Sequence, residues 1–106
     1  MTYDKLTKYN KLVRDKIPEY IRSVGKTPVI HIAGNREYWQ KLKEKLQEEV
    51  DEFNKSETID ELADILEVLF AIRDYKKFNQ KKLESVQTKK AQTRGKFKKK
   101  IILEES

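Results

Sequence analysis

Five carboxylates carry the chemistry that this sequence suggests: Glu48, Glu49, Glu52, Glu61 and Asp64. Their spacings of three and four residues are those of side chains that share one side of a helix. The chain has no cysteine and one histidine, so a metal site built from these groups would use oxygen ligands alone. Oxygen ligands suit hard cations. The sequence therefore predicts a site for Mg²⁺, with Mn²⁺ as a substitute.

Glu61 has an unusual position on the helix that is predicted around it. At about 100° per residue, Ile65 and Val68 lie within about 40° of Glu61, so the carboxylate falls inside the apolar sector of the helix. Holding a charged carboxylate there costs several kcal/mol unless it is paired, coordinated or protonated. We therefore expect Glu61 to have a function, with a salt bridge to Arg73 or Lys90 as the structural alternative.

Two long helices must position the carboxylates. Asn35 can cap a helix of about 18 residues that ends near Asn54. Residues 58–61, Thr-Ile-Asp-Glu, have the form of a capping box, so a second helix is predicted from Ile59 to about Tyr75. The short connection favours antiparallel packing, which brings the acidic edges of the two helices together. An acidic cluster this dense can hold more than one ion, as in sites that clamp the oxygens of phosphoryl transfer.

The remaining segments complete a mainly α fold, an antiparallel helical bundle. Residues 1–14 are expected to be a basic, irregular lead-in, and Asp15 and Gly25 are placed to begin and end a short helix. Asn79 and Gly95 bound a third, basic helix in the same way. Short β segments are predicted near residues 29–33 and 100–103.

Composition indicates one domain that needs a partner to finish its core. The chain has 106 residues, a length typical of one domain. Hydrophobic residues make up 37%, which is thin for this size, so we expect oligomerisation to complete the bundle. No stretch is apolar enough for a membrane span and no signal-peptide pattern is present. With no cysteine either, the cytoplasm is the expected location.

Charge is unevenly distributed along the chain. The total is 24 Lys and Arg against 18 Asp and Glu, a net charge of +6. Between residues 37 and 67 there are 11 acids and four lysines, whereas between residues 73 and 100 there are 12 bases and two acids. This pattern predicts a middle that attracts cations and an end that attracts anions. A protein that only binds nucleic acid would not need the acidic middle.

The carboxylate motifs resemble those of a known superfamily. The strings EEVDE (residues 48–52) and ELAD (residues 61–64) are similar to the EExxE…ExxD signature of the all-α nucleoside triphosphate pyrophosphohydrolases, the MazG-like superfamily. The basic strings YNKLVRDKIPE (residues 9–19) and KAQTRGKF (residues 90–97) resemble a small single-domain branch that is labelled phosphoribosyl-ATP pyrophosphohydrolase-like. Together the motifs span most of the chain, so one domain of this kind is expected over residues 1–106.

The resemblance implies an assembly, a reaction and a cofactor. Members are mainly helical and form dimers or dimers of dimers, so a homodimer or homotetramer is expected. They cleave a nucleoside triphosphate between its α and β phosphates and release a nucleoside monophosphate and pyrophosphate. Mg²⁺ is expected at the residues that match the family's ligands, with Glu48 in support: Glu49, Glu52, Glu61 and Asp64.

The roles of individual residues in this reaction are hypotheses. We expect the carboxylates to hold one or two Mg²⁺ ions while water attacks phosphorus in line and pyrophosphate leaves. Glu48 or Glu49 is the candidate for the general base that takes the proton of the water. Basic side chains are candidates for phosphate contacts, the arginines because their fork can bind two oxygens: Lys11, Arg14, Lys90, Arg94 and Lys96.

Two alternatives remain open. The first is phosphoribosyl-ATP pyrophosphohydrolase of histidine biosynthesis, which makes the same cut on a bulkier phosphoribosyl nucleotide. The second is a non-catalytic basic helical protein that binds nucleic acid through its C-terminal third, with an affinity that falls steeply as salt is added. The acidic middle of the chain favours a hydrolase over a nucleic-acid partner, and no membrane partner is expected.

Overall fold

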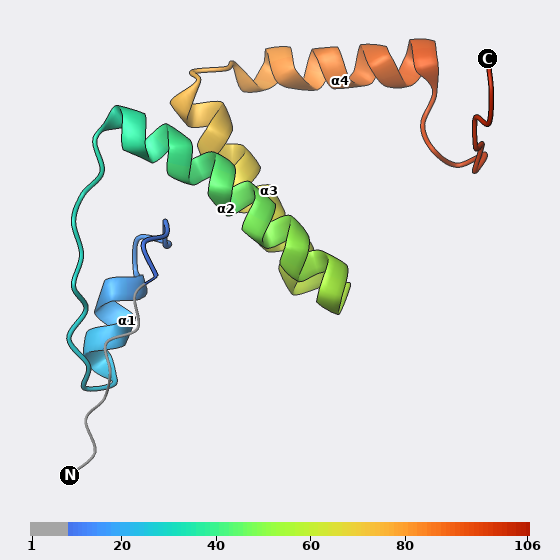
Figure 1. The fold of residues 1–106 in the computed structure, drawn as a ribbon. Coiled ribbons are helices and arrows are strands. Elements are labelled where there is room, and N and C mark those ends of the chain that lie inside the picture. Colours follow the sequence, from blue (N-terminus) through green and yellow to red (C-terminus); the bar gives the residue numbers. More distant parts are fainter. Residues whose placement is uncertain (1–8) are drawn as a thin grey trace. The chain divides into compact units, whose positions relative to one another are not determined.

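Four helices follow one another along residues 9–106, the part of the chain that the computed structural model describes: α1 (Ile17–Ser23), α2 (Asn35–Ser56), α3 (Ile59–Tyr75) and α4 (Gln80–Arg94) (Figure 1). This confirms the mainly α class. No strand occurs in that range, so the β segments predicted near residues 29–33 and 100–103 are wrong. A strand is stable only when a neighbouring strand pairs with its backbone. Val29 and Ile32, which are 83% and 89% exposed, lie instead in irregular chain.

The short helix α1 begins one residue later than predicted. Its N-cap is Lys16 and not Asp15, and no side chain caps it. Its C-terminal end is as predicted: Gly25 takes a φ of +83°, and the backbone N–H groups of Gly25 and of the next residue close a Schellman cap. Of the predicted irregular lead-in, residues 9–14 are irregular, and residues 1–8 lie outside the described residues.

Two residues join α2 to α3, and Figure 1 shows these helices side by side, so the chain reverses direction between them. The N-cap of α2 is Gly34, and Asn35, the predicted cap, is the first helical residue. Glu57 ends α2 with a left-handed φ of 53°. The Thr58 hydroxyl accepts the Glu61 N–H at 3.3 Å, which confirms the predicted start of α3.

The core of the first part of the chain is small. Among the described residues, Leu42 and Val68 are the buried apolar side chains. One face of α3 remains uncovered, although burial of apolar surface is the main favourable contribution to folding. Its side chains are 82%, 54%, 49% and 45% exposed and line a shallow hollow along the helix: Ile59, Leu62, Leu66 and Leu69. Oligomerisation stays a prediction, and this face is the surface that it would cover.

The chain divides into two compact units, Met1–Ile72 and Arg73–Ser106, and α4 belongs to the second. Both predicted ends of α4 are confirmed. Asn79 Oδ1 accepts the Lys82 N–H at 3.0 Å, and Gly95 follows the last helical residue with a φ of +83°. No residue of α4 is buried. The single domain and the bundle arrangement stay predictions. Of the helices described, none combines the length and the apolar character needed to cross a bilayer.

Candidate metal site

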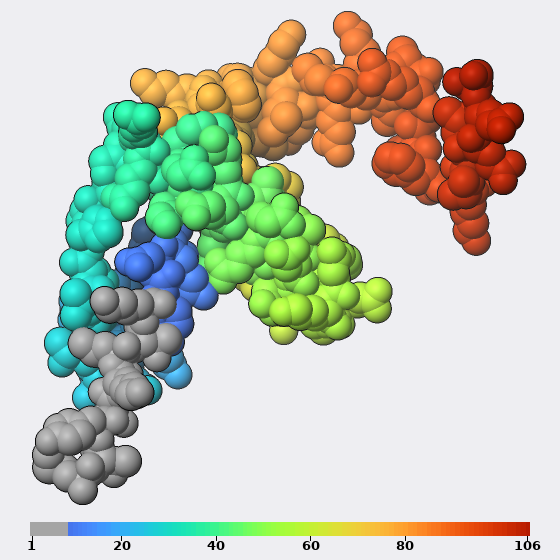
Figure 2. All heavy atoms as spheres, viewed as in Figure 1, coloured from blue at the N-terminus to red at the C-terminus, as the bar shows by residue number. Residues whose placement is uncertain are grey.

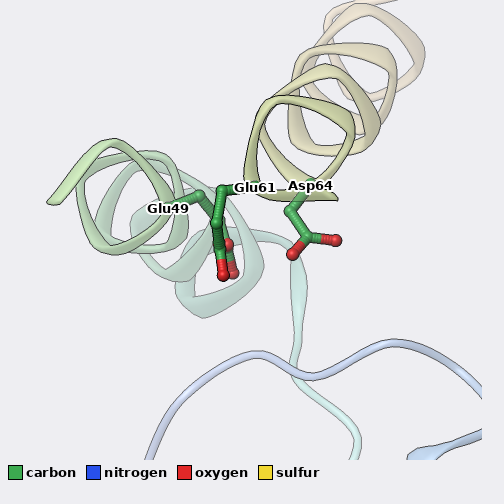
Figure 3. A group of neighbouring side chains, drawn as sticks. All are labelled: Glu49, Glu61 and Asp64. Atoms are coloured by element: carbon green, nitrogen blue, oxygen red, sulfur yellow. The ribbon is translucent and has the colours of Figure 1, made fainter. Parts of the chain in front are cut away.

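Three carboxylates from two helices meet in the first unit. Glu49 comes from α2, whereas Glu61 and Asp64 come from consecutive turns of α3 (Figure 3). One oxygen from each residue lies within 4.8 Å of those of the other two. Figure 3 shows the carboxyl groups of Glu49 and Glu61 side by side, with Asp64 next to them. The structure thus brings together three of the four predicted metal ligands, which we call the carboxylate group.

Glu49 is the buried member of the carboxylate group, with 8% of its surface exposed. Lys45, one turn earlier on α2, places its Nζ 3.2 Å from Glu49 and 3.3 Å from Glu48, and its side chain is only 16% exposed. This partner offsets the cost of burying the Glu49 charge. Lys45 was not among the predicted site residues, although its i+3 and i+4 spacing to two glutamates is the usual sign of ion pairs on a helix.

Glu48, a predicted base, has a cation on each of its carboxylate oxygens. Lys11 Nζ donates to Oε1 at 2.9 Å, and Lys45 Nζ lies 3.3 Å from Oε2. Partial burial alone would raise the pKa of Glu48, but the hydrogen bond from Lys11 and the charge of Lys45 outweigh it, so the pKa lies below its ordinary value. The same hydrogen bond raises the pKa of Lys11. Glu48 is therefore a weakened proton acceptor.

Glu61 is the member of the group whose charge is least compensated. Loss of solvation raises the pKa of Glu61, and the negative charges of its acidic neighbours, first among them Asp64, raise it further. Arg73, one of the alternatives for a salt bridge with Glu61, pairs with the adjacent Asp74 at 3.0 Å. A cation that bound here would relieve the repulsion at Glu61.

Asp64 is paired with a residue from a distant part of the chain. Arg14 Nη2 donates to Asp64 Oδ1 at 2.7 Å, and 50 positions separate the two residues. Figure 2 shows the first described residues (blue) against α2 (green), and in Figure 3 their backbone passes on the side toward which the carboxylates point. Lys11 and Arg14, which the sequence predicts as phosphate contacts, therefore lie at the carboxylates as their counterions.

The other predicted site residues lie outside the carboxylate group. Glu52 is exposed on α2, and its charge contributes to the raised pKa of Glu61, but its oxygens do not join the group. Lys90, Arg94 and Lys96 are exposed residues of the second unit. The ligand role of Glu52 and the phosphate roles of these three bases stay predictions.

The donors of the carboxylate group fit Mg²⁺ or Mn²⁺. All three are carboxylate oxygens, which hard divalent cations prefer, and the group contains neither sulfur nor imidazole. Mg²⁺ often binds through few carboxylates and keeps several waters, so positions would remain for substrate oxygens. Three like charges within a few ångströms also repel one another, which favours the binding of a cation between them.

Comparisons with known proteins do not place the chain in a family. No family model matches it, and no solved structure matches it. A stretch of 50 residues is 52% identical to an uncharacterized protein of Mycolicibacterium smegmatis. This stretch covers 47% of the chain and 51% of that protein, so the chain matches about half the length of this relative. A function has to be inferred from the site itself.

Proposed function

We propose that this chain is a Mg²⁺-dependent hydrolase that cleaves a nucleoside triphosphate between its α and β phosphates. The observation that carries the proposal is the meeting of Glu49, Glu61 and Asp64, whose oxygens lie within 4.8 Å of one another. The resemblance of the motifs in residues 48–64 to the MazG-like superfamily supports the same function. Because free nucleotides are the proposed substrates, we place the protein in the cytoplasm.

In the proposed reaction, the oxygen of water bonds to the α-phosphorus, and the bridging P–O bond to the β-phosphate breaks. The electron pair of that bond leaves with pyrophosphate. Bound Mg²⁺ would supply positive charge for the phosphate oxygens and lower the pKa of water. The chain has to hold the ion and accept the proton. Glu49 suits the proton better than Glu48, because lysines engage both oxygens of Glu48, whereas Lys45 engages one oxygen of Glu49.

The cations beside the carboxylate group suit a triphosphate substrate. Lys11 Nζ and Arg14 Nη2 lie 2.9 and 2.7 Å from oxygens of Glu48 and Asp64, so both are close to the proposed ion. An arginine fork can bind two phosphate oxygens, and a lysine acts as a point charge. A substrate bound through the ion would bring its phosphates within reach of these two side chains.

The test is a panel of standard, modified and phosphoribosylated triphosphates, assayed for released pyrophosphate with Mg²⁺ and again with EDTA. We expect at least one substrate to release pyrophosphate with Mg²⁺ and none to do so in EDTA. Cleavage restricted to phosphoribosyl-ATP would favour the histidine-biosynthesis alternative. Release from no substrate would contradict the proposal, and salt-sensitive binding of nucleic acid by the same preparation would then favour the basic binding protein.

We further propose that two copies of the chain pair through the uncovered face of α3. Its four exposed side chains follow the i, i+3, i+7 and i+10 positions of one helix side: Ile59, Leu62, Leu66 and Leu69. Such a strip is complementary to itself, because the same residues meet on both sides of a twofold axis. Two α2–α3 pairs would then form an antiparallel four-helix bundle, as a homodimer or as part of a homotetramer.

A further inference from the structure

The segment of residues 9–16, which we call the basic strap, reaches the carboxylates from far along the sequence. Lys11 and Glu48 are 37 positions apart, and Arg14 and Asp64 are 50 positions apart. The charged groups nevertheless lie 2.9 and 2.7 Å from each other. The strap therefore places two cations on acids at and beside the carboxylate group.

Local structure holds the two cations in place. Asn10 takes a left-handed φ of 47°, which turns the chain just before Lys11. The Lys11 ammonium lies 5.4 Å from the centre of the Tyr9 ring, a cation–π contact. At the other end, the Ile17 N–H donates to the Arg14 carbonyl at 3.1 Å, so Arg14 lies in the turn that begins α1. The strap thus presents its cations from an ordered turn.

The contacts of the strap are ones that another ion can displace. The side chains of Arg14 and Asp64 are 54% and 38% exposed, and those of Lys11 and Glu48 are 41% and 31% exposed. Ion pairs this open to water are weak. Lys45 differs, because it is 16% exposed and lies on the same helix as its partners. We therefore expect an incoming ion to displace the ion pairs of Lys11 and Arg14, whereas the ion pairs of Lys45 remain.

The charge balance indicates what the strap does. The carboxylate group and Glu48 carry four negative charges, and Lys11, Arg14 and Lys45 beside them carry three positive charges. The charges of Glu52 and Asp60 also act on Glu61, so negative charge predominates here. A divalent cation bound by Asp64 would compete with Arg14 for the oxygens of that carboxylate. Repulsion between the ion and the Arg14 guanidinium would favour either the release of Arg14 from Asp64 or the arrival of an anion between the two cations, and a triphosphate is such an anion.

We propose that the basic strap is a counterion switch. Arg14, assisted by Lys11, neutralises the carboxylates when no ion is bound and passes to the phosphates of the substrate when Mg²⁺ binds. The identity of that substrate rests on the proposed function, whereas the competition between Arg14 and a divalent cation rests only on metal binding at the carboxylate group and not on hydrolysis. Arg14 therefore opposes binding of the bare ion and favours binding of the ion together with a triphosphate. By linkage, the factor by which the bound ion changes the affinity for the triphosphate equals the factor by which the bound triphosphate changes the affinity for the ion.

The test compares Arg14→Gln with Lys16→Gln. Lys16 belongs to the same strap and is exposed, and in the described part of the chain it forms no ion pair, so Lys16→Gln removes one charge without removing an ion pair. Binding of Mn²⁺ alone is measured at low ionic strength from the electron paramagnetic resonance signal of the free ion. We expect Arg14→Gln to bind Mn²⁺ about twofold to fivefold more tightly than Lys16→Gln, the range for loss of an exposed ion pair.

A second titration adds a triphosphate analogue whose α,β bridge is methylene, with Mn²⁺ at saturation. Here Arg14→Gln is expected to bind the analogue about tenfold more weakly than Lys16→Gln, because a charged hydrogen bond to phosphate is lost. Arg14→Lys keeps the charge and should return the affinity for bare Mn²⁺ toward the wild-type value. Circular dichroism shows that the variants are folded.

Equal Mn²⁺ affinities of the two Gln variants would overturn the switch, as would weaker binding by Arg14→Gln or binding by neither. These readouts do not depend on turnover. Wild-type protein that binds Mn²⁺ but releases no pyrophosphate would contradict the proposed function, while the ratio of Mn²⁺ affinities would still decide the switch.

Discussion

The α2–α3 pair and the α4 region differ in how their charged side chains are arranged. Between α2 and α3, acids from two helices are held close together, and cations reach them both from the same helix and from the basic strap. In α4 and in the residues after it, the basic side chains are exposed, and α4 has no buried residue. Spread charges cost little, whereas gathered like charges repel. The gathered acids are therefore the candidate functional site, and the exposed bases of α4 are not.

The largest difference between the two regions is expected when one charge is removed from each and the activity is measured. Glu61→Gln keeps the shape of the side chain but removes a ligand charge, and we expect kcat/KM for pyrophosphate release to fall at least about 100-fold. Lys81→Gln, an exposed position on α4, is the matched control and should stay within about twofold of wild type. Equal losses in the two variants would contradict the placement of the site between α2 and α3.

The two regions should also differ in self-association. Leu66 on α3 and Val86 on α4 are 49% and 41% exposed, so both are open apolar side chains. Leu66→Asp would bury a charge in the proposed dimer interface, and we expect it to raise the dissociation constant at least about tenfold. Val86→Asp should leave association unchanged. Analytical ultracentrifugation measures both, and a wild-type protein that sediments as a monomer would exclude the interface.

Features that depend on neighbours in sequence could be predicted to within a residue, and two of the four predicted N-caps, Asp15 and Asn35, were misplaced by one position. The caps at Thr58 and Asn79 were found because their hydrogen bonds join residues three apart. Helical periodicity placed Glu61 on the side of α3 that carries the buried Val68, although Glu61 itself is only partly buried. The β segment at residues 29–33 was wrong for the opposite reason: a run of β-branched residues favours a strand, but the pairing partner that a strand needs cannot be read from the run itself.

Contacts between distant segments could not be predicted from the sequence pattern. Lys11 and Arg14 were recognised as cations for phosphate, but their pairing with Glu48 and Asp64 depends on how the chain folds back over 37 and 50 positions. Three of the four predicted ligands meet because a short link reverses the chain between α2 and α3. Helical periodicity alone could not decide that Glu52, on the same helix as Glu49, would remain exposed.

The helix caps offer a comparison with a smaller expected effect. Thr58→Ala and Asn79→Ala each remove a side-chain acceptor at a helix N-terminus, at 3.3 and 3.0 Å, and each should cost about 1 kcal/mol of stability. The donor at Thr58 is the N–H of Glu61, so only Thr58→Ala should also weaken Mn²⁺ binding. Urea unfolding and Mn²⁺ titration measure the two effects. Weaker Mn²⁺ binding by Asn79→Ala as well would show that α4 contributes to the site.

The smallest expected effect is a pH dependence that separates Glu61 from Glu48. Loss of solvation and the neighbouring negative charges raise the pKa of Glu61 above its ordinary value of 4.5, so its ionised form disfavours the native state. This penalty is present above the folded-state pKa and is relieved as pH falls through it. In EDTA, the free energy of unfolding of the wild type should therefore rise relative to that of Glu61→Gln between neutral pH and pH 4.5.

Glu48 should show the opposite sign in the same experiment. Although partial burial raises its pKa, the lysines outweigh burial and lower the pKa below 4.5. Its contribution to stability is therefore present above pH 4.5 and is lost as pH falls through the folded-state pKa, so below pH 4.5 the wild type should lose stability relative to Glu48→Gln. Urea unfolding at a series of pH values measures both differences. If the free energies of unfolding of the wild type and of Glu61→Gln changed equally between neutral pH and pH 4.5, the neighbouring acids would not raise the pKa of Glu61. The repulsion that favours a cation at this site would then be absent.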